Sequence, residues 1–168
     1  SGNQGHRFPG RLNLTCKPAK TGSKHSCKGE TVGIHVPRTL PDIEPHTEAF
    51  WTGGQSGHLM INQCQSCQRY VHPPVPMCPS CHSRDVVATP VSGKATVVSY
   101  TVNHMPWVPD LPVPYVFAAV ELDEQPGLRL STEIVNIDPE AVFIGMSVKV
   151  VFEQQEEIYL PLFEPQLP

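Results

Sequence analysis

The sequence contains few charged or aromatic residues and no long apolar run. Charged side chains make up 17% of its 168 residues and aromatic side chains 7%. No apolar run approaches the roughly 18 residues that a membrane-spanning helix needs, and the N-terminus lacks the continuous apolar core of a signal peptide. We therefore expect a soluble cytoplasmic protein that does not enter a membrane.

The usual catalytic motifs are also missing. The chain has no glycine-rich phosphate loop, no nucleophile elbow and no His-Glu-x-x-His sequence. Its histidines occur singly, and an isolated histidine is more often a surface residue than a catalytic base. The sequence therefore predicts no catalytic residue in this chain.

The distribution of charge argues against nucleic acid as the partner of the main domain. Residues 1–31 hold six of the 12 basic residues and only one acidic residue, Glu30. The other 137 residues carry six basic and fifteen acidic side chains, a formal charge of −9. A surface of this sign repels a phosphate backbone. A nucleic-acid-binding module remains an alternative, mainly because of the basic N-terminal segment.

Four cysteines form the most specific pattern in the chain. Cys64 and Cys67 make one Cys-x2-Cys pair, and Cys78 and Cys81 make a second pair ten residues later. Two such pairs can aim four thiolates at one point and enclose Zn²⁺ in a closed tetrahedral site, which leaves no position for an activated water. We therefore predict one structural Zn²⁺. A rubredoxin-type iron site uses the same ligands, and free or disulfide-bonded cysteines are the remaining interpretation.

Other possible metal ligands are less specific. His72 and His82 lie beside the four cysteines in the sequence and could replace one of them, but we expect both on the surface of the ribbon. Cys16 and Cys27, with His25 and His35 nearby, allow a second metal site or a pair of free thiols.

The rest of the pattern predicts a mainly β protein, because nineteen prolines fall between short apolar runs and exclude long helices. Pro45 is expected in the first turn of a short helix that carries Phe50 and Trp51 against the ribbon and ends at Gly53-Gly54. Five later strands, with a short helix between the third and the fourth, predict an OB-fold barrel. We expect Asp138 to cap that helix, and the strand 115–122 to be central because it is nearly continuously apolar.

The sequence divides into five predicted regions. The first is an irregular segment (1–38) that is either an added sequence or ordered by a partner. It is followed by a helical lead-in (39–57), a zinc ribbon (58–90), the OB-fold (91–164) and a tail or linker (165–168).

One connection between two predicted strands is unlike a solvated hairpin. Residues 103–114 contain four prolines together with His104, Met105 and Trp107. Such a stiff apolar loop suits a protein interface or the wall of an acyl pocket. The alternative is that Trp107 folds back and caps the barrel core.

The sequence also resembles a known family. From about residue 40 to residue 164 it is similar to the acyl-CoA-associated family, long a domain of unknown function, that joins a rubredoxin-like zinc ribbon to an OB-fold. The motifs that carry the resemblance are Phe50-Trp51, Leu59, His72-Pro73-Pro74, Cys78-Pro79-x-Cys81, Ser92-Gly93-Lys94-Ala95, Ser99-Tyr100-Thr101, Pro114-Tyr115, Leu122-Asp123-Glu124 and Ile144-Gly145-Met146. Residues 1–31 do not resemble the family.

The resemblance implies an accessory subunit of a carbon-carbon lyase. Its partner would be a thiolase-superfamily, lipid-transfer-like aldolase, as a heterotetramer, with a fused or associated MaoC-like hydratase as a further partner. The complex would cleave a steroid acyl-CoA by a retro-aldol reaction. Candidate contacts with partner or acyl-CoA are His104, Met105, Trp107, Tyr115 and Arg129, and Lys94 and Arg69 are further candidates for the CoA phosphates. A scaffold that bridges a thiolase and another acyl-CoA enzyme is the alternative.

Overall fold

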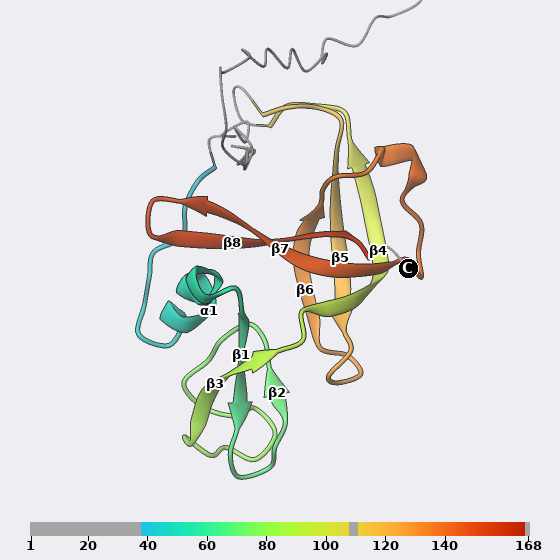
Figure 1. Ribbon diagram of the computed structural model, residues 1–168. Coiled ribbons are helices and arrows are strands. Elements are labelled where there is room, and N and C mark those ends of the chain that lie inside the picture. Colours follow the sequence, from blue (N-terminus) through green and yellow to red (C-terminus); the bar gives the residue numbers. More distant parts are fainter. Residues whose placement is uncertain (1–37, 108–110, 167–168) are drawn as a thin grey trace, which may run out of the picture. The chain divides into compact units, whose positions relative to one another are not determined.

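The computed structural model describes residues 38–107 and 111–166, all of which belong to one compact unit. The predicted irregular segment and the second metal site at Cys16 and Cys27 lie outside the described residues. The described chain is mainly β, with a short helix, a three-stranded sheet and a closed five-stranded barrel, which confirms the predicted fold class (Figure 1). None of the described helices is long and apolar enough to cross a membrane.

The lead-in to the sheet is helical but differs in detail from the prediction. Helix α1 spans Glu48–Thr52, so Pro45 lies in the turn before it. The chain does not leave the helix at the two glycines but continues as a 3-10 helix, η1, over Gly53–Ser56. It ends at Gly57, whose positive φ of 76° suits a residue without a side chain.

The ribbon is an antiparallel sheet with the order β2-β1-β3. Its strands are β1 (Leu59–Cys64), β2 (Tyr70–Val71) and β3 (Val86–Val91). Strand β1 connects two cores, because its first half packs into the barrel core and its last residue, Cys64, lies in a small separate cluster.

The barrel has the strand order β4-β5-β6-β8-β7 and closes by pairing β7 with β4. Its inward residues alternate with outward ones, as in β5, where Val116, Ala118, Val120 and Leu122 are buried. A register shift between Val97 and Ser99 marks an irregularity in the long first strand, the kind of feature that bends a strand so that a barrel can close. The strands are β4 (Lys94–Asn103), β5 (Tyr115–Leu122), β6 (Arg129–Ile134), β7 (Ser147–Gln155) and β8 (Ile158–Pro165).

A short 3-10 helix, η2 (Pro139–Ala141), connects the third and fourth barrel strands, β6 and β7. The Asp138 side chain accepts a hydrogen bond from the Glu140 amide at 3.0 Å, and Pro139 occupies the first helical position. The predicted cap is therefore present.

Side-chain hydrogen bonds connect the ribbon to the barrel. Gln125, in the turn between β5 and β6, accepts a bond from the Tyr70 amide at 3.0 Å and donates one to the Tyr70 carbonyl at 3.2 Å. Glu124 accepts a bond from the Ser92 amide at 2.6 Å. Helix α1 lies beside β8 (Figure 1), where Gly54 leaves room for Phe152 and Tyr159 to approach the 3-10 helix closely.

Candidate functional site

The four predicted cysteines converge at the tip of the ribbon. Their sulfur atoms all lie within 4.8 Å of one another, and none of the four is in a disulfide. The Sγ atoms of Cys64 and Cys81 are 3.5 Å apart, and those of Cys67 and Cys78 are 3.7 Å apart. A tetrahedron with Zn–S bonds of about 2.3 Å has sulfur–sulfur edges of about 3.8 Å. The cluster therefore has the dimensions of a four-thiolate metal site.

Two tight turns produce this arrangement. After each Cys-x2-Cys pair the chain takes a left-handed conformation, at Gln68 (φ 61°) and at His82 (φ 59°). The Gln68 amide bonds the Cys64 carbonyl at 2.8 Å, and the His82 amide bonds the Cys78 carbonyl at 2.9 Å. Both turns fold backbone amides around the first sulfur of the pair, which favours thiolate there.

Backbone amides lower the pKa values of Cys64 and Cys78, the first cysteine of each pair. Hydrogen bonds from the amides of Cys81 and Ser80 lower the pKa of Cys78 to about 6. The Cys67 amide makes the largest contribution to a lower pKa of Cys64, with a smaller one from the Ser66 amide. Thiolates are the form that binds zinc. The donor set and its spacing fit a bound metal ion, and Cys64 and Cys78 favour the thiolate form. The pKa of Cys81 is instead raised to about 12: despite a hydrogen bond from the Ser83 backbone, hydrogen bonds with the other three sulfurs and burial favour its thiol when no metal charge is present.

The two neighbouring histidines are not part of the cluster. Among the described residues, the only group of potential ligands that meets at one point consists of the four cysteines. His82 is exposed, as expected. His72 is half-buried: its Nδ1 is buried, and the centroid of its ring lies 5.1 Å from that of Phe50.

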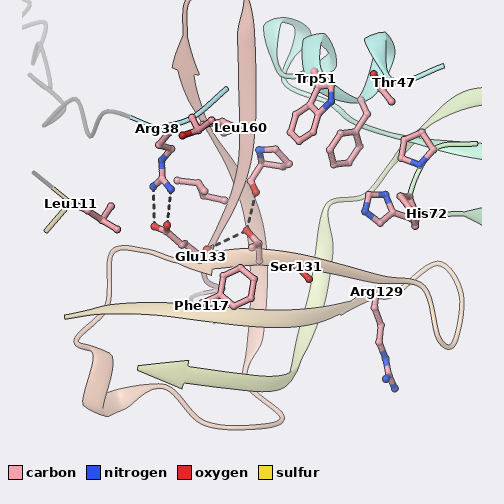
Figure 2. Close-up of a pocket in the computed structure, with 17 residues that line it drawn as sticks. Arg38, Thr47, Trp51, His72, Leu111, Phe117, Arg129, Ser131, Glu133 and Leu160 are labelled. Carbon is pink, nitrogen blue, oxygen red and sulfur yellow. Dashed lines mark hydrogen bonds and ion pairs between the residues drawn. The ribbon is translucent and has the colours of Figure 1, made fainter. Parts of the chain in front are cut away.

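A second feature is a groove of about 790 Å³ that the sequence analysis did not predict. One wall consists of Phe50 and Trp51 from α1 and of His72 with the two prolines that follow it. The opposite wall is the outer face of β5 and β6 with Phe117 and Ser131, and part of β8 closes the groove (Figure 2). Most of the lining side chains are apolar or aromatic.

Both arginines that line the groove are paired with carboxylates. Arg38 forms a two-pronged ion pair with Glu133, at 2.6 and 2.9 Å, and also bonds Glu153 at 3.1 Å. These hydrogen bonds, the strongest of them from Glu133, raise the pKa of Arg38 despite its partial burial. Arg129 bonds Glu121 at 3.0 Å. The groove therefore presents polar groups without an unpaired cation among its lining residues.

The remaining predicted contact residues lie outside the groove. Met105 and Trp107 are 61% and 71% exposed, so Trp107 does not cap the barrel core. His104 is exposed and Tyr115 is half-buried at the start of β5. Of the five candidates, only Arg129 lines the groove. The exposed tip of the loop thus lies outside the groove, although Leu111 of the same loop lines it.

Comparison with known proteins gives the family. Residues 51–87 match the rubredoxin-like zinc ribbon domain of ChsH2, and residues 88–153 match the C-terminal OB-fold domain of ChsH2. A DUF35 domain-containing scaffold protein of Methanocaldococcus jannaschii is 36% identical over 97 residues, which are 56% of this chain and 67% of that protein. The chain belongs to the DUF35 family.

Two further relatives of this DUF35 protein are considerably longer. A probable enoyl-CoA hydratase alpha subunit of Thermomonospora curvata is 41% identical over 71% of this chain. The 3-oxo-4,17-pregnadiene-20-carboxyl-CoA hydratase alpha subunit of Mycobacterium tuberculosis is 35% identical over 74% of this chain. The DUF35 chain spans 38% and 39% of the length of these two subunits.

A solved structure shows the same arrangement of domains. The DUF35 chain matches a chain of the Ltp2-ChsH2(DUF35) aldolase with 38% identity and a TM-score of 0.68, over 76% of this chain and 100% of the other. ChsH2 is the partner of Ltp2 in that aldolase. The similarity extends over both the ribbon and the barrel.

Local sequence patterns do not reveal the groove, because its residues come from distant segments of the chain. Arg38 pairs with residues 95 and 115 positions away. One available indication was strand 115–122, which is apolar on both faces. The apolar run predicted a central strand, and its outward Phe117 is 46% exposed and forms part of the groove.

Proposed function

We propose that this chain is an accessory subunit that docks on a thiolase-superfamily, lipid-transfer-like aldolase and helps to hold its acyl-CoA substrate. The observation that carries the proposal is the exposed apolar loop, in which Met105 and Trp107 project from a barrel with a closed core. The similarity to the whole matched chain of the Ltp2-ChsH2(DUF35) aldolase supports an aldolase as the partner.

The docking surface consists of Met105, Trp107 and Val113, with His104 and Tyr115 beside them. The three apolar side chains are between 40% and 71% exposed, although they are large. Monomeric proteins rarely expose such groups together, and a tryptophan at the centre of an interface often contributes most of the binding energy. We propose a heterotetramer of two accessory and two catalytic subunits.

In this proposal the ribbon holds one structural Zn²⁺ through Cys64, Cys67, Cys78 and Cys81. Four thiolates fill the coordination shell, so the ion would stabilise the ribbon without activating water. A site made of reduced thiols agrees with a cytoplasmic location.

The reaction of the complex would be retro-aldol cleavage of a steroid side chain. A base takes the proton of the substrate hydroxyl, the bond between the carbinol carbon and the α-carbon breaks, and the resulting thioester enolate takes up a proton. The products are a ketone and a shorter acyl-CoA. We assign the proton-transfer groups to the aldolase subunit and the docking and substrate-holding roles to this chain.

Reconstitution with the aldolase of the same organism tests the proposal. The zinc-loaded chain is mixed with that aldolase, the mass of the complex is measured by light scattering, and cleavage of a β-hydroxyacyl-CoA is assayed. We expect cleavage only with both subunits, and loss of the complex with Trp107→Ala. Phe143→Ala is the matched control, because Phe143 is 57% exposed in a different loop. Turnover by the isolated chain, or a complex that is indifferent to Trp107, would overturn the proposal.

A scaffold without substrate contact is the second candidate, favoured by the name of the archaeal relatives. It would bridge two acyl-CoA enzymes, for example a thiolase and a MaoC-like hydratase. Alanine at His104 and Trp107 separates the two roles. A scaffold loses only complex formation, whereas a substrate-holding subunit also changes turnover or substrate range in complexes that still form.

A nucleic-acid-binding module is a third possibility that we expect to fail. The barrel pairs Arg129 with Glu121 and Lys149 with Glu164, which weakens any basic track for a phosphate backbone. Binding of residues 40–168 to a single-stranded oligonucleotide, measured at two salt concentrations, should be absent.

A further inference from the structure

The groove has the size and lining of a small-molecule site. Its volume of about 790 Å³ falls within the range of pockets that bury ligands with a few fused rings. Phe50 and Trp51 meet edge to face, with ring centroids 4.7 Å apart, and give one wall a fixed aromatic surface. The opposite wall is a β-sheet face. The aromatic part of the first wall belongs to α1 and the opposite wall to β5 and β6, while His72 and the two prolines come from the turn after β2.

The charges in the groove select against phosphates. A CoA nucleotide carries several negative charges and needs cations that are free to pair with them. Arg38 is already held by Glu133 and Glu153, and Arg129 is held by Glu121. The two guanidinium groups are thus already matched by three carboxylates, of which Glu133 itself lines the groove. The groove is therefore better matched to a neutral ligand.

His72 supplies the polar group that such a ligand would satisfy. Its Nδ1 is buried and has no hydrogen-bond partner among the residues that the structure describes. A buried polar atom without a partner is costly, and a ligand group that completes the hydrogen bond removes this cost. Because this nitrogen lies below the accessible surface, the ligand reaches it when the imidazole turns toward the groove. Figure 2 shows the His72 ring on the ribbon side of the groove, opposite Ser131. Burial lowers the pKa of His72 to about 4, so the ring is uncharged at neutral pH and suits a carbonyl or hydroxyl group.

We infer that this groove binds the neutral, apolar acyl part of the substrate, with a carbonyl or hydroxyl group bonded to His72, while the CoA nucleotide stays outside. This inference rests on the proposed function, which requires the chain to help hold an acyl-CoA, and it adds the place and the chemistry of the held part. The name of the Mycobacterium tuberculosis relative includes a 3-oxo steroid acyl group, which has these properties.

The two tryptophans make the test selective. The chain has only Trp51, in the groove, and Trp107, in the docking loop. In the full-length, zinc-loaded chain with Trp107→Phe, all tryptophan emission therefore comes from the groove. Progesterone, a neutral four-ring ketone, is the probe, and free CoA is the counter-probe. We expect a saturable change in Trp51 emission with progesterone and none with CoA.

Two variants on the same background locate the probe. Ser131→Phe places a ring on the groove wall and should abolish the saturable change, whereas Ser147→Phe, at an exposed β7 position outside the groove, should preserve it. His72→Phe keeps the ring shape but removes the hydrogen bond, so progesterone should bind about tenfold more weakly. Circular dichroism and zinc content check that each variant is folded.

The outcomes separate this inference from the proposed function. CoA binding without progesterone binding, or progesterone binding that is unaffected by Ser131→Phe, would overturn the inference. If progesterone does not bind but the wild-type chain still forms an active complex with the aldolase, the groove assignment fails and the accessory role stands. If progesterone binds in the groove but no complex forms, the accessory role fails and the ligand site stands.

Discussion

The ribbon tip and the barrel are two parts of one chain that are stabilised in different ways. At the tip, the buried cluster contains only Cys64, Val71 and Cys78, with two valines packed against it. The main core has sixteen buried hydrophobic residues, which come from the barrel, from α1 and from the base of β1. The tip has too few apolar contacts to fold by burial alone, whereas the barrel has many.

This difference indicates what the proposed zinc ion would contribute. The proposed zinc ion would replace the missing core at the tip, so its loss should affect that region first. Leu59 and Ile61 belong to the main core even though they precede the first cysteine in the same strand. The boundary between the two kinds of stabilisation therefore lies within β1, beyond Ile61.

The largest expected effect comes from removing one sulfur ligand. Cys78→Ser should abolish tight zinc binding and unfold the tip, because structural zinc contributes on the order of 10 kcal/mol of apparent folding free energy in small modules. The barrel strands should persist on their own core. Zinc content by mass spectrometry and proteolysis between residues 65 and 85 measure the two effects. Ser80→Ala, in the same turn, should leave both unchanged, and full zinc occupancy in Cys78→Ser would refute the ligand assignment.

A substitution in the barrel core should destabilise the barrel and not the metal site at the ribbon tip. Phe163 is fully buried, and Phe163→Ala should lower the free energy of unfolding by about 3–5 kcal/mol through lost burial and a residual cavity. Urea denaturation followed by circular dichroism measures the loss. The control, Phe143→Ala, removes an exposed ring and should cost less than about 0.5 kcal/mol. Equal effects of the two substitutions would mean that Phe163 does not lie in the core.

A smaller and pH-dependent effect is expected where the ribbon meets α1. The pKa of His72 is lowered by burial to about 4 from a usual value of 6.5, so the unfolded chain binds a proton that the folded chain excludes. Stability should therefore fall as the pH drops from about 6.5 towards 4, by on the order of 2 kcal/mol. His72→Phe should remove this slope. His58→Phe, at an exposed histidine, should retain it, and measurements from pH 6.5 to 5.5 limit interference from acid release of the metal.

Local patterns in the sequence predicted most of the fold. The spacing of the four cysteines and the cap at Asp138 each depend on neighbours in the chain, and the structure shows both. The helix end was misplaced because two adjacent glycines favoured a stop there. The structure continues through them, since Gly54 is needed for close packing against Phe152 and Tyr159.

The groove could not be predicted in the same way. It exists only because the turn after β2 lies against α1 and both face the outer side of β5 and β6. Arg38 and Glu133 are unremarkable in the sequence, and their pairing depends on the closed barrel. His72 was assigned to the surface because nothing near it in the chain predicts that Phe50 covers its ring.

The smallest expected effect tests how closely the two regions are coupled. Gln125 bonds both the amide and the carbonyl of Tyr70, and Gln125→Ala leaves these partly buried backbone groups without that partner. The expected cost is about 1 kcal/mol. Hydrogen exchange at Tyr70 and Val71 should accelerate while exchange at Val120 in the barrel stays slow. Gln154→Ala, which removes a bond within the β7–β8 hairpin, should leave β2 unchanged. Equal acceleration of β2 and barrel amides would mean that the ribbon and the barrel unfold together, and that the metal and the apolar core stabilise one cooperative unit.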